Sequence, residues 1–263
     1  MKNTAVVTGA SSGLGAIFAE QLAQRGFSLV LAGRDQARLD AVKQRIGQST
    51  EVELVVGDLG TGNGVEDLIT HLNGRVVDVL VNNAGFGTYG PFAEIDAGRE
   101  HELVAVNVDA PVRLIHAVLP GMLARGRGGI LNVASTIAFQ PGTYQATYGA
   151  SKAFVLSLSQ ALWAETRGSG VTVTALCPGP TRTGFVDALG SDVSHTATYR
   201  HLAAPGPVVA AGLRGLDRGR AVVVPGWRNR VMTTGGRLGP GWLSALVSGR
   251  MLRPAEAPAK SSR

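Results

Sequence analysis

The stretch TAVVTGASSGLG, residues 4–15, joins a short apolar run, typical of a buried strand, to a glycine-rich turn. A helical segment follows the turn and extends to about Arg25. Glycines let the backbone turn sharply and approach a pyrophosphate, and the N–H groups at the helix start then face its charge. The glycine spacing differs from the G-x-G-x-x-G fingerprint, so a turn that merely caps a helix is the alternative. The residues expected to bind the pyrophosphate are Gly9, Ser11, Ser12, Gly13, Leu14 and Gly15.

The rest of the chain, up to about residue 225, repeats this alternation of apolar strand and helix. Continuous runs rich in Val, Ile and Leu between helical segments are typical of a parallel sheet covered on both faces. We therefore predict an α/β fold: a single doubly wound Rossmann domain, residues 1–225, with a seven-stranded parallel sheet and helices on both faces. Such sheets bind ligands at the carboxyl ends of their strands, where the strand order reverses. The expected strands are residues 4–8, 27–33, 52–58, a fourth contained within 76–85, then 129–135, 171–177 and 221–225.

The residues after the second strand favour NADP as the dinucleotide. An acid at this point would accept hydrogen bonds from the ribose 2′-OH of NAD, whereas an arginine can pair with the 2′-phosphate of NADP. Glycine stands at the usual acid position here, and Arg34 follows it. Asp35 could pair with Arg34 or bind the ribose itself, so NAD is the alternative, as is a solvated surface arginine. The residues expected near the adenosine half are Arg34, Asp58, Leu59, Asn83, Ala84 and Gly85.

Tyr148 and Lys152 are the predicted proton-transfer pair. They lie four residues apart on an expected helix, 148–167, so both side chains share one face. A phenol has a pKa of about 10, and an adjacent ammonium, with the positive nicotinamide ring of the oxidised cofactor, would stabilise the phenolate enough for catalysis near neutral pH. Ser135, after the fifth strand, can hydrogen-bond the substrate oxygen. Tyr144 is a competitor, but no lysine follows it at the same spacing.

Taken together, these motifs resemble the short-chain dehydrogenase/reductase family from Thr4 to about Pro225. Each motif is modest alone, because a tyrosine and a lysine four residues apart also arise by chance on solvated helices. Their shared order and spacing make the resemblance specific. The matching features are TGASSGLG (8–15), Asp58-Leu59, NNAG (82–85), Asn107, Ser135, Tyr148 with Lys152, and CPGPT (177–181).

The resemblance implies a role for each of four catalytic residues. Asn107 would hold a water in a proton relay to Lys152, and Ser135 would position the substrate. Tyr148 would give or take the proton, while Lys152 would bind the nicotinamide ribose and lower the pKa of Tyr148. The residues implied to contact the nicotinamide half are Tyr148, Lys152, Pro178, Gly179 and Thr181.

The excess positive charge of the chain lies in a C-terminal extension, residues 226–263. Of the 25 basic and 19 acidic residues, seven basic and one acidic fall in this segment, which leaves eighteen of each in residues 1–225. The charge therefore gives no support for nucleic-acid binding. Arginines interleaved with Trp and Leu indicate a basic amphipathic segment on an anionic membrane surface, or packing on the body or a partner subunit. Glycines at 235, 236, 239 and 241 argue against one long helix.

Other features of the sequence bear on location and partners. The single cysteine, Cys177, excludes an internal disulfide and lies in an apolar run, so we expect a buried thiol. We expect a cytoplasmic protein, because there is no signal-peptide pattern and no apolar stretch of about 20 residues. The five histidines lack metal-ligand spacing, so no metal is expected. The resemblance implies a homo-oligomer, a dimer or a tetramer.

We predict an NADP(H)-dependent oxidoreductase that interconverts a carbonyl and a primary or secondary alcohol on an apolar substrate. A non-catalytic dinucleotide-sensing protein on the same fold is the alternative, and the intact catalytic set argues against it. A sugar-nucleotide epimerase is a weaker alternative, because little chain follows the sixth strand. Residues 181–205 are placed to form a lid. The residues expected around the substrate are Phe86, Tyr89, Phe92, Phe139, Phe185, Leu189, His195 and Tyr199.

Overall fold

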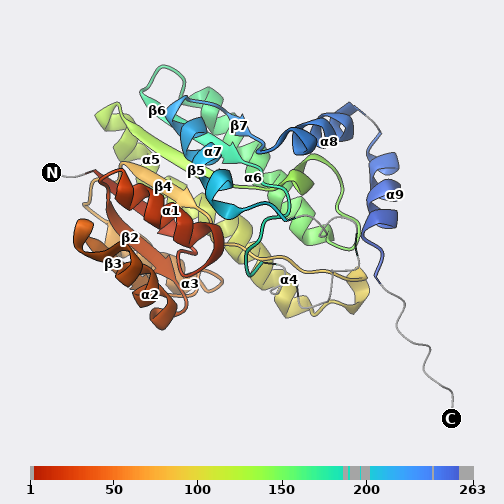
Figure 1. The fold of residues 1–263 in the computed structure, drawn as a ribbon, viewed down its shortest axis with the longest axis horizontal. Coiled ribbons are helices and arrows are strands. Elements are labelled where there is room, and N and C mark those ends of the chain that lie inside the picture. The colour runs from red at the N-terminus through yellow and green to blue at the C-terminus, as the bar shows by residue number, and fades with distance from the viewer. Residues whose placement is uncertain (1–2, 186–188, 190–195, 197–201, 239, 255–263) are drawn as a thin grey trace, which may run out of the picture.

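A computed structural model describes residues 3–185, 189, 196, 202–238 and 240–254 of the chain (Figure 1). Strands and helices alternate as the sequence predicts. The strands are β1 (Thr4–Thr8), β2 (Ser28–Gly33), β3 (Val52–Val56), β4 (Val79–Asn82), β5 (Gly128–Val133), β6 (Val171–Leu176) and β7 (Val222–Val223). The helices are α1 (Gly13–Gln24), α2 (Gln36–Ile46), α3 (Gly62–Leu72), α4 (Ala97–Val104), α5 (Ala110–Arg125), α6 (Ala146–Glu165), α7 (Pro205–Asp217), α8 (Trp227–Leu238) and α9 (Gly241–Met251).

The strands form one seven-stranded parallel sheet in the order β3-β2-β1-β4-β5-β6-β7. The order reverses between β1 and β4, and open α/β sheets bind ligands at such a point, in the crevice outside the carboxyl ends of the strands. The predicted α/β class, the single doubly wound domain and the seven parallel strands are confirmed. β4 lies within the stretch that was expected to contain it, the other predicted bounds are one or two residues too long at several strand ends, and β7 has only two residues.

Two apolar layers cover the sheet, one on each face. Successive residues of a strand point to opposite faces, so Val7 belongs to one layer and Val6 to the other. Helices α1, α2 and α7 pack on the Val7 face, and α3, α5 and α6 pack on the Val6 face. The core therefore holds the sheet rigidly, and its carboxyl edge carries the loops that contain the predicted site.

A continuous helical run, Ala97–Arg125, links α4 to α5 through a π-helical turn, Ala105–Asp109. Its 29 residues include an 18-residue window of mean hydropathy 1.4, which by length and composition could span a membrane. The sequence prediction that no such stretch exists overlooked this segment. Leu103, Leu114 and Met122 point inward and are fully or almost fully buried. A helix that packs in a protein core can be as apolar as one that spans a membrane.

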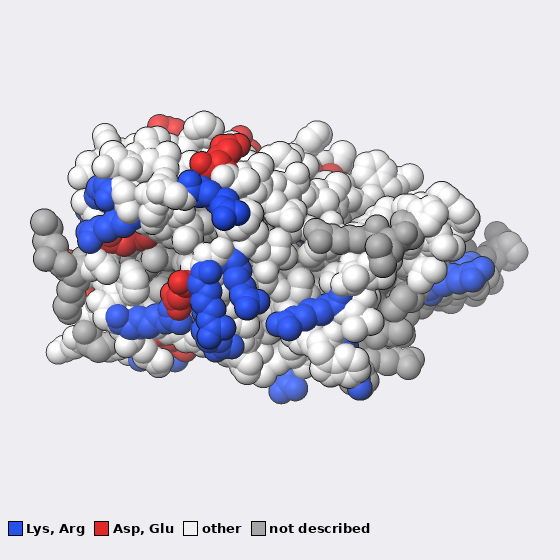
Figure 2. All heavy atoms as spheres, turned by 90° about the horizontal axis from the view of Figure 1, so that it is seen from above, with Lys and Arg blue, Asp and Glu red and all other residues white. Residues whose placement is uncertain are grey.

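The C-terminal extension folds as two helices, α8 and α9, at the end of the molecule farthest from the N-terminus (Figure 1). They are separate helices, as the glycines of this segment predict. Several apolar side chains on them are exposed: Trp227, Val231, Met232, Trp242, Leu243, Leu246 and Val247. Basic and acidic groups neighbour one another over the body (Figure 2), whereas residues 227–254 contain five arginines and no acid.

Candidate active site

The glycine-rich turn after β1 is packed so closely that side chains would not fit. A Cβ on Gly9 would lie 2.8 Å from the Ala84 Cα, and one on Gly15 would lie 2.1 Å from the Gly9 oxygen. Ser12 precedes α1 but makes no side-chain capping bond, so the first-turn N–H groups of α1 lack this side-chain partner. A bare backbone cradle at an uncapped helix start fits a pyrophosphate.

The two strand ends at the reversal point are joined by hydrogen bonds of Asn83 and Thr8. The Asn83 amide donates to the backbone oxygens of Thr8 (2.9 Å) and Gly9 (3.2 Å). The Thr8 hydroxyl accepts from the backbone N–H groups of Asn83 and Ala84, each at 3.0 Å. Asn83 therefore links the segment after β4 to the end of β1, a contact that its predicted place near the ribose did not reveal.

Arg34 projects from the end of β2 into a cluster of carboxylates. Its guanidinium lies 3.4 Å from Asp58 and 3.1 Å from Glu102, and its side chain is 58% exposed. Asp35 instead caps α2 through the Arg38 N–H and pairs with the Arg38 side chain at 3.2 Å. Asp35 therefore does not pair with Arg34, as it could have done. Asp58 and Glu102 pair with Arg34 instead, and the Glu102 contact was not predicted.

Because Gly33 has no side chain, Ser11 can lie close to the end of β2. A Cβ there would lie 3.5 Å from both Cβ and Oγ of Ser11. Ser11 of the phosphate turn therefore lies beside Gly33, the residue that precedes Arg34. A 2′-phosphate needs such a hydroxyl and guanidinium, whereas the acid that would bind a free 2′-OH is missing from this position.

Tyr148 and Lys152 lie in the first two turns of α6, and both are buried. The Lys152 Nζ donates to the backbone oxygen of Val133 at 2.9 Å, which anchors the side chain at the end of β5. It lies 5.8 Å from the centre of the Tyr148 ring. Burial lowers the pKa of Lys152 to about 8, and the Cys177 thiol acts weakly in the opposite direction. The ammonium thus lies next to the phenol in a site with little water to screen its charge.

Asn107 lies in the π-helical turn and connects three parts of the site. Its amide oxygen accepts from the Phe86 N–H at 3.2 Å, and its amide nitrogen donates to the Phe86 oxygen at 2.9 Å. The same nitrogen donates to the Ser151 hydroxyl at 3.0 Å. A Cβ on Gly85 would lie 2.8 Å from the Asn107 oxygen and 3.2 Å from the Lys152 Nζ, so both atoms face one point. The implied water relay remains a prediction.

Ser135 follows β5 by two residues and begins a short 3₁₀ turn, Thr136–Phe139. Its hydroxyl accepts from the Ile137 N–H at 3.3 Å, and the side chain is half-buried. The Thr136 N–H donates to the Pro178 oxygen at 2.9 Å. Ser135 is therefore held beside the turn after β6, where Thr181 donates to the Gly179 oxygen at 2.9 Å.

The apolar surroundings of Tyr148 come from several loops. Phe86 is buried in one cluster with Tyr148, and the Phe185 ring centre lies 5.3 Å from that of Tyr148. Two predicted lining residues lie elsewhere: Phe92 is 64% exposed, and Phe139, the last residue of the 3₁₀ turn, packs among buried residues such as Val155. The predicted lid residues His195 and Tyr199 lie outside the described residues.

The structure also identifies contacts that the sequence analysis missed. Ser151 accepts from Asn107 and donates to the backbone oxygen of Tyr148 at 2.8 Å; its place between Tyr148 and Lys152 was an available signal. Asn229 of α8 packs on Gly179, where a Cβ would meet its amide at 2.7 Å, and no local pattern predicts this contact. Tyr144 has a φ of 64°, unusual for a residue with a side chain, and packs in an apolar cluster with Tyr89.

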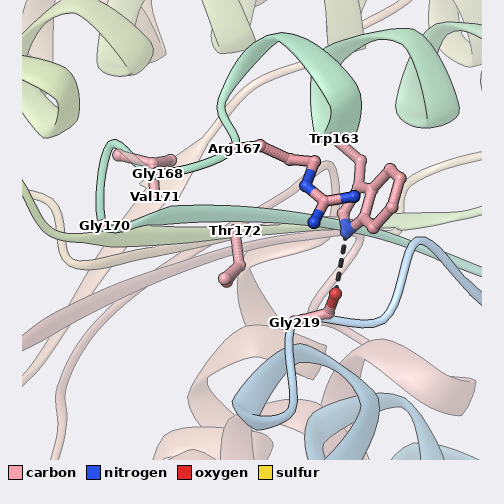
Figure 3. Close-up of a pocket in the computed structure, with 7 residues that line it drawn as sticks. All are labelled: Trp163, Arg167, Gly168, Gly170, Val171, Thr172 and Gly219. Atoms are coloured by element: carbon pink, nitrogen blue, oxygen red, sulfur yellow. Dashed lines mark hydrogen bonds between the residues drawn. The ribbon is translucent and has the colours of Figure 1, made fainter.

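A separate hollow of about 280 Å³ lies at the opposite edge of the sheet (Figure 3). The Trp163 indole donates to the Gly219 oxygen at 2.7 Å, and Arg167 stacks 5.1 Å from the ring centre. Val171, the first residue of β6, also lines the hollow. The predicted catalytic residues lie instead at the carboxyl ends of the strands, which is where parallel sheets bind their ligands.

Comparisons with known proteins agree with this geometry. Residues 3–194 match the family described as short chain dehydrogenase. A short-chain dehydrogenase from Sphingobium yanoikuyae, solved in complex with NADPH, is 34% identical, with a TM-score of 0.82 and 99% of each chain covered. A bulky-bulky ketone specific alcohol dehydrogenase from Comamonas testosteroni is 32% identical, with a TM-score of 0.77 and 98% of each chain covered.

Relatives in this group include one whose name denotes a loss of activity. The human inactive hydroxysteroid dehydrogenase-like protein 1 is 34% identical over 179 residues, which are 66% of this chain and 54% of that protein. The chain likewise covers 54% of the chicken hydroxysteroid dehydrogenase-like protein 1, at 37% identity. The chain therefore spans about half the length of these two relatives.

Proposed function

The chain belongs to the short-chain dehydrogenase/reductase family, and we propose that it uses NADP(H) to interconvert a ketone and a secondary alcohol. The observation that carries this proposal is the buried Tyr148 with the Lys152 ammonium beside it at the crevice of the sheet. The bare glycine turn and the Arg34 and Ser11 side chains support the choice of cofactor.

The proposed mechanism divides the chemistry between cofactor and protein. The nicotinamide supplies the hydride, and the protein fixes the geometry and the proton supply. Ser135 holds the substrate oxygen by a hydrogen bond. Tyr148 donates its proton to that oxygen as negative charge develops there during reduction, and it accepts the proton in the reverse direction. The Lys152 ammonium stabilises the resulting phenolate, and the Asn107 and Ser151 contacts hold this part of α6 in place.

Tyr148→Phe tests the mechanism most directly, because it removes one hydroxyl and keeps the ring. General acid–base catalysis contributes about 10² to 10⁴-fold, so we expect kcat/KM for ketone reduction to fall at least 100-fold. NADPH affinity, measured by calorimetry, should change less than threefold. The nearby Tyr144→Phe should cost less than tenfold. Turnover that survives Tyr148→Phe would refute the assignment.

We propose an apolar ketone with two bulky substituents as the substrate class. Phe86, Phe185 and Leu189 offer apolar contacts around Tyr148, and the Comamonas enzyme is described as specific for bulky-bulky ketones. Reduction rates for ketones graded from acetone to diaryl ketones, followed by NADPH absorbance, test this choice. A preference for small or charged carbonyls would contradict it.

The human relative named as inactive makes non-catalytic dinucleotide binding the alternative function. In that case NADPH would bind and no carbonyl in the series would be reduced. The cytoplasmic location and the homo-oligomer remain predictions. We propose that a second copy of the chain covers the exposed apolar face of α8 and α9, with an anionic membrane surface as the alternative partner.

A further inference from the structure

One face of α9 is anchored to the loop that precedes α6. Ser248 is 3% exposed; its hydroxyl accepts from the Thr143 N–H and donates to the Pro141 oxygen, both at 3.1 Å. The Thr143 hydroxyl donates to the Ala245 oxygen at 2.7 Å. Trp242 and Leu246 on the same helix are 67% and 60% exposed. Since one side is hydrogen-bonded and buried, α9 has a fixed position against the loop that leads to Tyr148.

The chain after α9 is held at a second point by Tyr89. The Tyr89 hydroxyl donates to the Leu252 backbone oxygen at 2.8 Å, across 163 positions of sequence. Both residues are buried, at 6% and 5% exposure, and share an apolar cluster with Leu189. Burial, followed by the nearby Tyr144, raises the pKa of Tyr89, which keeps the hydroxyl protonated and able to donate.

The same cluster is continuous with the catalytic tyrosine. Phe185 packs against it and against Tyr148. A Cβ on Gly87 would lie 3.0 Å from Leu189, 3.1 Å from Phe185 and 3.3 Å from the Tyr148 ring. These three side chains therefore converge on Gly87, and Leu189 shares its apolar cluster with Tyr89 and Leu252. A contact chain runs from the C-terminal segment to the reacting phenol.

We propose that Leu252 is a positioning residue for substrate selectivity, which acts through Leu189 and the Tyr89 hydrogen bond. The inference rests on the proposed carbonyl chemistry. With Leu252 in place, Leu189 is pressed toward Gly87 and limits the space beside Tyr148. A smaller residue at 252 would let Leu189 retreat and would admit a larger substituent on the ketone. Cofactor binding at the other half of the crevice should not respond.

Leu252→Ala in the full chain tests the inference, with Leu123→Ala at an exposed position of α5 as the matched control. We expect the ratio of kcat/KM for diaryl over dialkyl ketones to rise at least fivefold, mainly through KM. One methylene in an apolar pocket changes discrimination by about 10 to 200-fold, which sets the scale. Leu252→Met, which keeps a side chain of similar size, should keep the wild-type ratio of kcat/KM for diaryl over dialkyl ketones. NADPH affinity should stay within threefold in all variants.

Two further measurements separate failure of the inference from failure of the proposed function. Ketone affinity in the presence of NADP⁺, which cannot reduce it, is measured by calorimetry and requires no turnover. Tyr89→Phe keeps the ring, removes the bond to Leu252 and should shift selectivity in the same direction. A wild-type protein that reduces no ketone refutes the proposed function alone. The inference is overturned if ketone affinity varies with substituent size in the same way in Leu252→Ala, in Tyr89→Phe and in the wild type.

Discussion

The Lys152 ammonium is removed from water, yet it has a firm backbone partner in the Val133 oxygen. Loss of hydration disfavours the charged form, and burial therefore lowers the pKa of Lys152 to about 8. A lysine with this pKa is still mostly protonated at neutral pH. It can stabilise a phenolate beside it and can also release a proton more readily than a surface lysine.

This burial predicts a specific pH dependence of stability. The lysine of the unfolded chain titrates near its ordinary value of 10.5, so between pH 8 and 10.5 the unfolded state binds more protons than the folded state. The free energy of unfolding should therefore rise with pH across this window, relative to Lys152→Met. Between pH 7 and 9.5 the expected gain is about 2 kcal/mol. Urea titrations of both cofactor-free proteins measure it, and parallel pH profiles would contradict the prediction.

Arg34 carries the prediction about cofactor choice. Its present partners, Asp58 and Glu102, are exposed enough for a 2′-phosphate to compete for the guanidinium. Loss of a hydrogen bond to a charged group costs about 1.5 to 3 kcal/mol, so Arg34→Ala should weaken NADPH binding about 10 to 100-fold. NADH binding should hardly change. Calorimetry with both cofactors checks this, and Arg45→Ala, which removes a guanidinium paired with Glu20, is the control. A strong NADH preference unaffected by Arg34→Ala would exclude the NADP assignment.

At the scale of elements, the sequence predicted the strands, turns and helices that depend on local residue pattern. The strand, glycine turn and helix of residues 4–24 could be predicted because the apolar period changes at glycines that permit the turn. The pairing of Tyr148 with Lys152 followed from helical spacing. The contact of Leu252 with Tyr89 could not be predicted, because it joins distant segments without a periodic signal. Phe92 and Phe139 were misplaced because aromatic residues fill cores and surfaces as often as pockets.

The tight glycine turn gives a prediction at this scale. In Gly15→Ala, the added Cβ would meet the Gly9 oxygen at 2.1 Å, so the turn must open. Overpacking of this kind costs about 1 to 3 kcal/mol, and we expect a lower Tm and at least tenfold weaker NADPH binding. Gly62→Ala at the first residue of α3, where a Cβ meets nothing within 4 Å, should leave both unchanged. Equal behaviour of the two variants would refute the role of the turn.

At the scale of the whole molecule, charge and apolar surface are unevenly distributed. The first 225 residues carry balanced charges, whereas α8, α9 and the chain beside them carry arginines without acids. On these helices Trp227 is 71% exposed and Val231 is 65% exposed. Several large apolar side chains exposed on two consecutive helices indicate an interaction site, whereas single scattered ones do not. Tail-on-tail contact would bring like charges together, so a second copy should present part of its acid-bearing body instead.

We expect a second copy of the chain to cover the exposed apolar side chains of α8 and α9. In sedimentation-velocity runs at 0.15 M salt, the wild-type chain should form a dimer or larger assembly, and the double variant Trp227→Ser with Trp242→Ser should shift toward monomer. Both substitutions lie on exposed positions, so the Tm should hold. Leu252 faces the opposite way, and Leu252→Ala should leave the assembly intact. If the wild type is monomeric but pellets with phosphatidylserine vesicles at low salt, and the double variant does not, the partner is the membrane surface. That result would also explain the arginines, because binding between basic residues and anionic lipid weakens as salt screens the charges.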